Sequence, residues 1–146
     1  MGPGQEARQV RAVLDTNVLI SAMVFKGESH HLVATWRSGH LRLFASPAIV
    51  AEYVQVLHYP KFKLSEETIA GYLNDNLLPY LESAKPARGP LPFPCADPDD
   101  DKSLMAALGA RADMLITGDT DLLVLNGKYH FKIVTPNQAL HLLKTK

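Results

Sequence analysis

Residues 10–17 read VRAVLDTN, a short and nearly all-apolar run with an acid directly after it. A parallel strand that is covered by helices on both faces requires such a continuous apolar run. We therefore predict a buried strand at residues 10–14 that ends at Asp15. In an α/β fold, ligands bind outside the carboxyl ends of the strands, so Asp15 stands where a functional site is expected.

Apolar runs of strand length alternate with segments of helical period along the rest of the chain. We predict further strands at residues 41–45, 114–117 and 131–135, and helices at 17–24, 29–39, 65–81 and 104–111. Two more helices start with specific signals, a hydroxyl cap before a proline at Ser46-Pro47 and a capping box at residues 135–138. Residues 83–98 are rich in Pro, Gly and Ala, which predicts a surface connection with one short edge strand near Phe93. The alternation indicates an α/β fold with a single parallel sheet sandwiched by helices.

Length and composition narrow the class of protein. The 146 residues suffice for one domain but not for two of ordinary size, so we expect a flexible tail at residues 1–9 and a single domain at 10–146. The formal net charge is zero, so any nucleic-acid binding must be local. The single cysteine, Cys95, excludes an intrachain disulfide and fits a reducing compartment. With no long apolar stretch or signal-peptide layout, we predict a soluble, cytoplasmic protein without a membrane partner.

Acids recur where other predicted elements begin. Residues 97–101 read DPDDD, Asp119 and Asp121 follow the strand at 114–117, and Glu52 lies in the helix that starts at Ser46. One helix start can use one or two acids, and further carboxylates repel one another by a few kcal/mol at an effective dielectric constant of ~20. A divalent cation is the usual relief, and oxygen ligands suit Mg²⁺ or Mn²⁺.

Each acid also has an ordinary interpretation. Asp15 alone could cap a helix, and a glutamate at the border of an amphipathic helix, such as Glu52, is usually solvated. Two phosphate-handling folds are disfavoured. A dehalogenase-type phosphotransferase or phosphatase requires a second acid where Asn17 stands, and a receiver-type phosphoacceptor requires paired acids after its first strand. No glycine fingerprint or P-loop lysine follows the strand either.

Four segments together resemble the PIN-domain ribonucleases, most closely the bacterial group of toxins from toxin–antitoxin pairs. The segments are VLDTNVLIS at 13–21, SPAIVAE at 46–52, DPDDDK at 97–102 and ITGDTDLL at 116–123. They occur in the family's order, and the resemblance spans nearly all of residues 11–143. It implies a Rossmann-like α/β/α sandwich and a metal-dependent endoribonuclease that cleaves single-stranded RNA. It also implies a quartet of catalytic and metal-binding acids, Asp15, Glu52, Asp101 and Asp119.

Other polar residues of these motifs are supporting candidates. The resemblance matches Asn17 and Thr117 to supporting polar positions. Three further acids, Asp97, Asp100 and Asp121, rank second because they crowd the same motifs. We expect the quartet to hold one or two ions of Mg²⁺ or Mn²⁺, with Glu52 orienting the water that attacks the phosphodiester.

The expected substrate, single-stranded RNA, must approach an acidic site, so nearby bases should assist it. The candidate bases are Lys26, Arg37, Lys61, Lys63 and Lys102. An antitoxin protein and a homo-oligomer are the other candidate partners. The alternative hypothesis is a non-catalytic PIN-like module that binds RNA or protein. Replacement of one acid of the quartet by a neutral residue would favour it, and all four acids are present.

Overall fold

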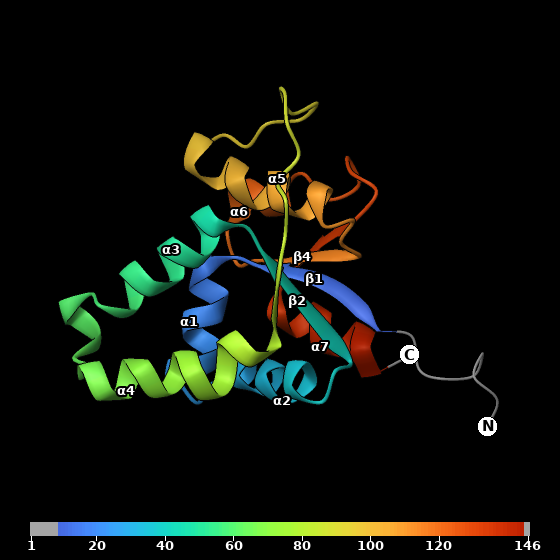
Figure 1. Cartoon of the computed structure of the whole chain (residues 1–146). Helices are drawn as coiled ribbons and strands as arrows, with labels where there is room; N and C mark the ends of the chain where they lie inside the picture. The colour runs from blue at the N-terminus through green and yellow to red at the C-terminus, as the bar shows by residue number, and fades with distance from the viewer. Residues whose placement is uncertain (1–8, 145–146) are drawn as a thin grey trace.

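The computed structural model describes residues 9–144, and a parallel sheet lies at its centre (Figure 1). Its strands, in the described part of the chain, are β1 (Val10–Leu14), β2 (Leu41–Ala45), β3 (Leu81–Ser83), β4 (Met114–Ile116) and β5 (Lys132–Val134). Their order in the sheet is β3-β2-β1-β4-β5, so β1 is the middle strand. The residues Ala12, Val13 and Leu14 are at most 1% exposed, which confirms the prediction of a buried strand.

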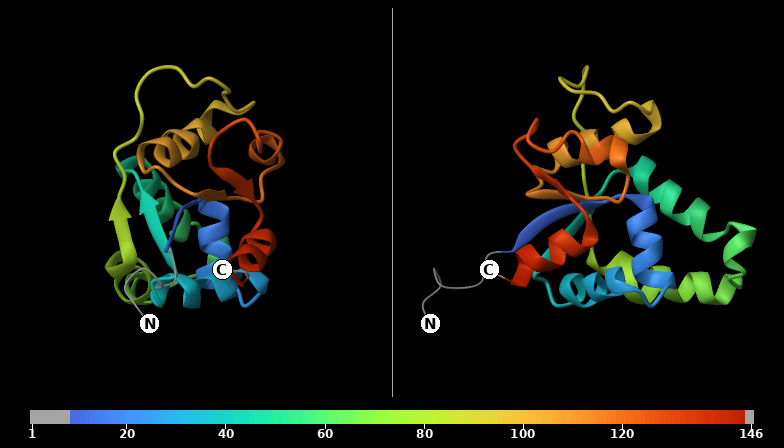
Figure 2. Two further views of the ribbon diagram at one scale, coloured as in Figure 1. Left: turned by 90° about the vertical axis from the view of Figure 1, so that its right-hand side faces the viewer. Right: turned by 180° about the vertical axis from the view of Figure 1, so that it is seen from behind.

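Helices lie on both sides of this sheet. They are α1 (Thr16–Val24), α2 (His31–Arg37), α3 (Pro47–Leu57), α4 (Glu66–Gly71), α5 (Asp101–Gly109), α6 (Thr120–Leu123) and α7 (Pro136–Lys144). α5 packs on β1 and β4 on one side, whereas α1, α2 and α7 lie on the other side in all the views of Figures 1 and 2. α3 and α4 project beyond the sheet at the left of Figure 1. The arrangement confirms the predicted three-layer α/β/α fold.

Three helices begin at one edge of the sheet, because the strands that precede them are parallel. α1 follows β1 with Asp15 as its N-cap, and α3 follows β2 with the Ser46 hydroxyl accepting a hydrogen bond from the Ile49 amide at 3.4 Å. α6 follows β4 with Asp119 as its N-cap. The predicted helix start at Ser46-Pro47 is thus confirmed, and the carboxyl edge of the sheet carries three polar caps side by side.

The last helix also begins as predicted. The Thr135 hydroxyl accepts a hydrogen bond from the Gln138 amide at 3.2 Å, and the Gln138 side chain accepts one from the Thr135 amide at 2.9 Å. This reciprocal pair is a capping box, and it satisfies two amides that a helix start would leave without partners. The strands at 114–117 and 131–135 are shorter at their ends than predicted. The predicted tail lies outside the described residues, apart from Gln9.

The helix predicted at residues 65–81 is wrong in its second half. α4 passes into a π-helix at Tyr72–Leu77 and a 3-10 turn at Leu78–Tyr80, and the chain then forms β3. Pro79 lacks an amide hydrogen and cannot continue an α-helix, and it lies in the 3-10 turn that ends the helical stretch. β3 pairs in parallel with β2, in the register Leu43↔Leu81. The sequence did not reveal this strand, because it is short and only half-buried.

The edge strand predicted near Phe93 is also wrong. The backbone of Phe93 is held instead by one side chain, because the Tyr129 hydroxyl accepts a hydrogen bond from its amide at 3.2 Å and donates one to its carbonyl at 2.6 Å. The two rings make an edge contact, and Tyr129 stacks on the buried Phe131. The Tyr129 hydroxyl therefore satisfies the backbone amide and carbonyl that a neighbouring strand would otherwise have satisfied.

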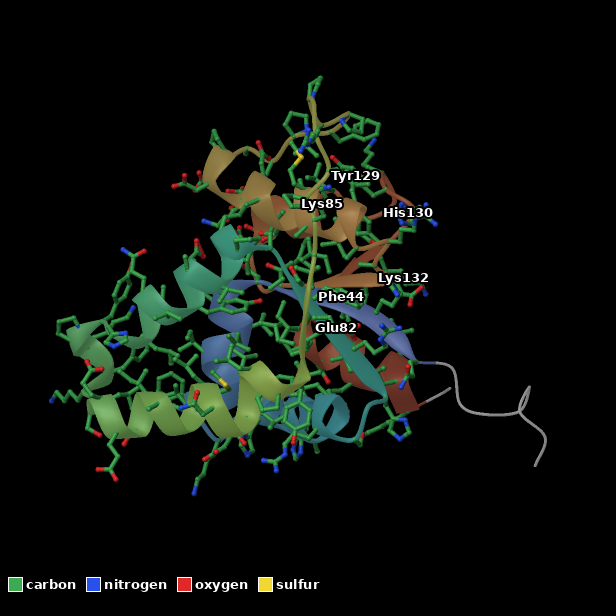
Figure 3. The ribbon with its side chains drawn as sticks, in the orientation of Figure 1. Phe44, Glu82, Lys85, Tyr129, His130 and Lys132 are labelled. Atoms are coloured by element: carbon green, nitrogen blue, oxygen red, sulfur yellow. The ribbon has the colours of Figure 1, made fainter. Side chains whose placement is uncertain are left out.

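The connection after β3 crosses α5 at very close range. It rises past the edge of the sheet and arches over the helix, with Lys85 in front of α5 in Figure 3. The Ala87 amide donates a hydrogen bond to the Met105 carbonyl at 3.0 Å. A Cβ atom at Gly109 would lie 1.8 Å from the Lys85 carbonyl oxygen, so this crossing requires glycine.

We predict that Gly109→Ala destabilises the protein although alanine is the better helix former. The methyl group forces the connection away from α5, and we expect a net loss of about 1–2 kcal/mol, or a Tm lower by roughly 3–6 °C. Thermal unfolding followed by circular dichroism measures this. Gly71→Ala is the matched control, because its Cβ would meet nothing within 4 Å, and it should keep or raise the Tm. An equal rise of the Tm in both variants would show that the connection does not pack tightly against α5.

Candidate metal centre

Asp15 is buried at the carboxyl end of β1, with 8% of its surface exposed. One carboxylate oxygen accepts a hydrogen bond from the Thr16 amide at 2.8 Å, and the other accepts one from the Thr117 hydroxyl at 2.8 Å. Asp15 is therefore both the cap of α1 and a buried charge at the sheet edge. Burial raises its pKa, the two hydrogen bonds oppose that rise, and the charges of Asp119 and Glu52 add to it.

Thr117 joins Asp15 to the next acidic motif. Its hydroxyl donates to Asp15 and also accepts a hydrogen bond from the Asp119 amide at 3.0 Å. Asp119 in turn caps α6 by accepting from the Asp121 amide at 2.9 Å. The predicted supporting residue Thr117 thus lies between two predicted site acids, and its side chain is fully buried.

Asp100 lies beside Asp119 in this structure. The two side chains are hydrogen-bonded, and burial, this hydrogen bond and the Asp119 charge raise the pKa of Asp100 to about 7. Carboxylate oxygens of Asp100, Asp119 and Asp121 come within 4.8 Å of one another. Asp97, another predicted candidate, is exposed and caps the 3-10 turn at Pro98–Asp100 by accepting from the Asp99 amide at 3.0 Å.

Asp101 faces a different part of the protein. Its carboxylate accepts a hydrogen bond from the Cys95 amide at 2.8 Å, and its charge contributes to a raised pKa of Tyr129. Asp100 also contacts Cys95, because the thiol donates a 3.8 Å hydrogen bond to its carboxylate, but Asp100 and not Asp101 lies within 4.8 Å of Asp119 and Asp121. The structure brings Asp100 to Asp119 and ties Asp101 to the chain segment that precedes the helix.

Glu52 reaches the site from α3 and is only partly exposed. One of its oxygens accepts a hydrogen bond from the Thr16 hydroxyl, and the other pairs with the Lys102 ammonium. The Glu52 carboxylate is the main cause of a raised pKa of Lys102. Glu52 and Asp15 are therefore neighbours, as predicted from their motifs, and Thr16 lies between them.

Two contributors to this site were not assigned a site role from the sequence. The buried Tyr53 hydroxyl donates a 2.6 Å hydrogen bond to the Leu14 carbonyl, directly before Asp15, and so ties α3 to the end of β1. Thr16 bonds both neighbouring acids, Asp15 through its amide and Glu52 through its hydroxyl. In the sequence, the only signal for a role of Tyr53 was its position next to Glu52. Asn17, by contrast, is exposed on the first turn of α1.

The donor set fits a hard divalent cation. The acids Asp15, Asp100, Asp119 and Asp121 supply only oxygen ligands, and burial together with the neighbouring Asp119 carboxylate raises the pKa of Asp100. Mg²⁺ and Mn²⁺ prefer such ligands. The arrangement is thus suited chemically to metal binding at the carboxyl edge of the sheet.

Comparison with known proteins agrees with this geometry. The chain matches the family described as PIN domain over residues 11–121, more than half of its length. A search of curated proteins found no match. Across the described residues, no helix has the length and apolar character to cross a membrane.

We predict that the metal-free protein becomes less stable as pH rises from about 4 to 7. The ordinary pKa of an aspartate is 3.8, but that of folded Asp100 is about 7, so in this window the folded state holds a proton that the unfolded chain has lost. Asp100→Asn removes the charge and should flatten this dependence. At pH 8 we expect it to stabilise the metal-free protein by about 1–2 kcal/mol after allowance for solvent screening, or roughly 3–6 °C in Tm.

Melting curves between pH 5 and pH 8, recorded with a chelator, measure this effect. Asp75→Asn is the control, because Asp75 is an exposed acid on the π-helix. If Asp100→Asn and Asp75→Asn melt alike at every pH, the carboxylates do not repel one another in solution.

Proposed function

Because the chain belongs to the PIN-domain family, whose members are generally metal-dependent nucleases, we propose that it is an endoribonuclease that cleaves single-stranded RNA with Mg²⁺ or Mn²⁺. The observation that carries this proposal is the convergence of acids from four separate segments at one edge of the sheet. Asp15 acts electrostatically on Asp100, and Asp119 and Glu52 act on Asp15. Helix capping accounts for two of these acids, Asp15 on α1 and Asp119 on α6, but not for Glu52 or Asp100.

We propose Asp15, Asp100 and Asp119 as the residues that hold the metal, with Glu52 beside them. The reason for Asp100 in place of Asp101 is its hydrogen bond to Asp119. Asp101 then has a positioning role, because its bond to the Cys95 amide fixes the turn that presents Asp100. Asp121 is a further candidate ligand through its closeness to Asp119.

The residues of the chain prepare the site for phosphodiester hydrolysis. When bound, a divalent cation lowers the pKa of a water and offsets the charge that develops on the phosphate. Thr117 and the Thr16 amide keep the Asp15 carboxylate in one orientation through two hydrogen bonds. Glu52, held by the Thr16 hydroxyl and the Lys102 ammonium, is the carboxylate that we expect to orient the attacking water.

The choice of single-stranded RNA is supported by bases and aromatic rings on one surface. The rings of Phe25 and Phe62 make an edge contact at 5.9 Å, and Lys61 lies over the Phe62 ring. Phe25 is 51% exposed and precedes Lys26. Exposed rings can stack on unpaired bases, and ammonium groups attract phosphates. Among the other candidate bases, the Arg37 guanidinium donates a hydrogen bond to the Asn76 side chain.

A finer proposal is that the protein is the toxin of a toxin–antitoxin pair in the cytoplasm. Its support is the order of the four motifs in the sequence, which resembles that of the bacterial toxin group, and the single cysteine fits a reducing compartment. An antitoxin protein would then be its partner, and self-association is compatible with the same proposal.

We predict that Asp15→Asn and Asp100→Asn each reduce cleavage of single-stranded RNA by about 100-fold or more, because an amide keeps the shape but loses the ligand charge. Asp101→Asn should retain more activity than Asp100→Asn. The assay uses purified protein, Mn²⁺ and an end-labelled RNA, with products resolved on a gel.

Three controls make this assay decisive. Circular dichroism checks that each variant is folded, and Asp15→Asn purified in parallel detects contaminating nuclease. A chelator should abolish cleavage and added Mg²⁺ or Mn²⁺ should restore it. Cleavage that survives exhaustive chelation would contradict the metal-dependent mechanism, and loss in Asp101→Asn but not in Asp100→Asn would restore Asp101 as the ligand.

The toxin role predicts growth arrest. Induced expression of the wild-type chain in a bacterial host should stop colony growth, because cleavage of cellular RNA blocks protein synthesis, whereas Asp15→Asn at the same protein level should not. Growth curves and immunoblots measure both. Normal growth with an active purified enzyme would refute the toxin role and leave the nuclease proposal standing.

A further inference from the structure

The Lys102 ammonium lies within the acidic site. It pairs with one carboxylate oxygen of Glu52, while the Thr16 hydroxyl donates to the other. The side chains of Lys102 and Glu52 are 33% and 29% exposed, so water competes only in part for this pair. Both oxygens of Asp15 also accept hydrogen bonds, but among the proposed site acids of the described chain it is Glu52 that pairs with a positive charge.

The other carboxylates form a separate group. Asp100, Asp119 and Asp121 gather within 4.8 Å, and Asp15 acts on Asp100 from the end of β1. Within residues 9–144, the ion pairs involve none of these four acids. Glu52 thus differs from these four acids in being paired with a lysine, although it lies beside Asp15.

We propose, on the premise that the site is metal-dependent, that Lys102 supplies the second positive charge of this centre and that the chain binds one divalent cation, not two. Hydrolases with two metals place them about 3.5–4 Å apart and use further acids for the second ion. Asp121 belongs to the cluster of Asp100 and Asp119 that would hold the first ion, which leaves Glu52 for a second ion, and Lys102 pairs with Glu52. The single cation would be held by Asp15, Asp100 and Asp119.

Lys102 is placed to act as a positioning residue for the substrate. It follows Asp100 and Asp101 on the first turn of α5, and Glu52 holds its ammonium from α3. An ammonium is a compact charge with three donors, which suits a phosphate oxygen of the RNA. Glu52 then holds Lys102 where its ammonium would contact a phosphate of the RNA.

An ordinary ion pair between α3 and α5 is the competing explanation. Such a pair contributes about 0–1 kcal/mol to stability and has no effect on metal stoichiometry. The two explanations therefore differ in the number of ions bound, not in Tm.

The test is the number of Mn²⁺ ions bound per chain, measured by isothermal titration calorimetry and by electron paramagnetic resonance of the free ion. We expect one for the wild type, one for Lys102→Arg, which keeps the charge, and two for Lys102→Met, which frees Glu52. The second ion should disappear again in the double variant Glu52→Gln/Lys102→Met. Lys132→Met, which removes an exposed lysine on β5, is the matched control and should bind one. Lys102→Gln provides a second neutral variant if Lys102→Met does not fold.

Each outcome decides between the explanations. Two ions in the wild type, or one ion of unchanged affinity in both Lys102→Met and Lys102→Gln, would overturn the proposal and leave the nuclease function standing. A second ion that persists in the double variant would overturn the assignment to Glu52. No bound ion in any variant would overturn the proposed metal-dependent function, and this inference with it.

Discussion

Burial of the Asp15 carboxylate is the constraint on which the rest of the site depends. A buried charge is costly unless hydrogen bonds satisfy it, and here a helix amide and a threonine hydroxyl do so. To deliver Thr117, β4 must pair beside β1 in the register Leu14↔Ile116. To deliver the amide, α1 must begin at Thr16. Sheet register and helix start therefore both follow from one acid.

The position of this acid in the sheet explains why acids from distant segments meet there. From β1 the chain builds β2 and β3 on one side, then returns to build β4 and β5 on the other. The connections after β1 and β4 diverge at this reversal, and ligands of doubly wound sheets bind at such a point. Asp15 and Asp119 follow the two strands there, and α3 and the turn before α5 bring Glu52 and Asp100 to the same edge.

Most of the fold could be predicted from local patterns, because β1, β2 and the capped helices are strongly marked in the sequence. β3 could not, because a π-helix and a proline precede a strand of three residues. At the site, Asp15, Glu52, Thr117 and Asp119 were predicted as members of one cluster and lie together. Which aspartate of the run lies close to Asp119 depended on the 3-10 turn at Pro98–Asp100, and the sequence of the run does not show where such a turn ends.

The Tyr129 hydroxyl, which holds both backbone groups of Phe93, has a consequence for the long connection between β3 and α5. A flexible segment loses conformational entropy when its ends are fixed, and the loss grows with the logarithm of its length. One tether in its middle divides the connection into two shorter closed loops, anchored on a ring that stacks on buried Phe131. The segment that leads into the Asp100 turn is thereby preorganised, so the ordering of that acid is largely complete before a metal or substrate arrives.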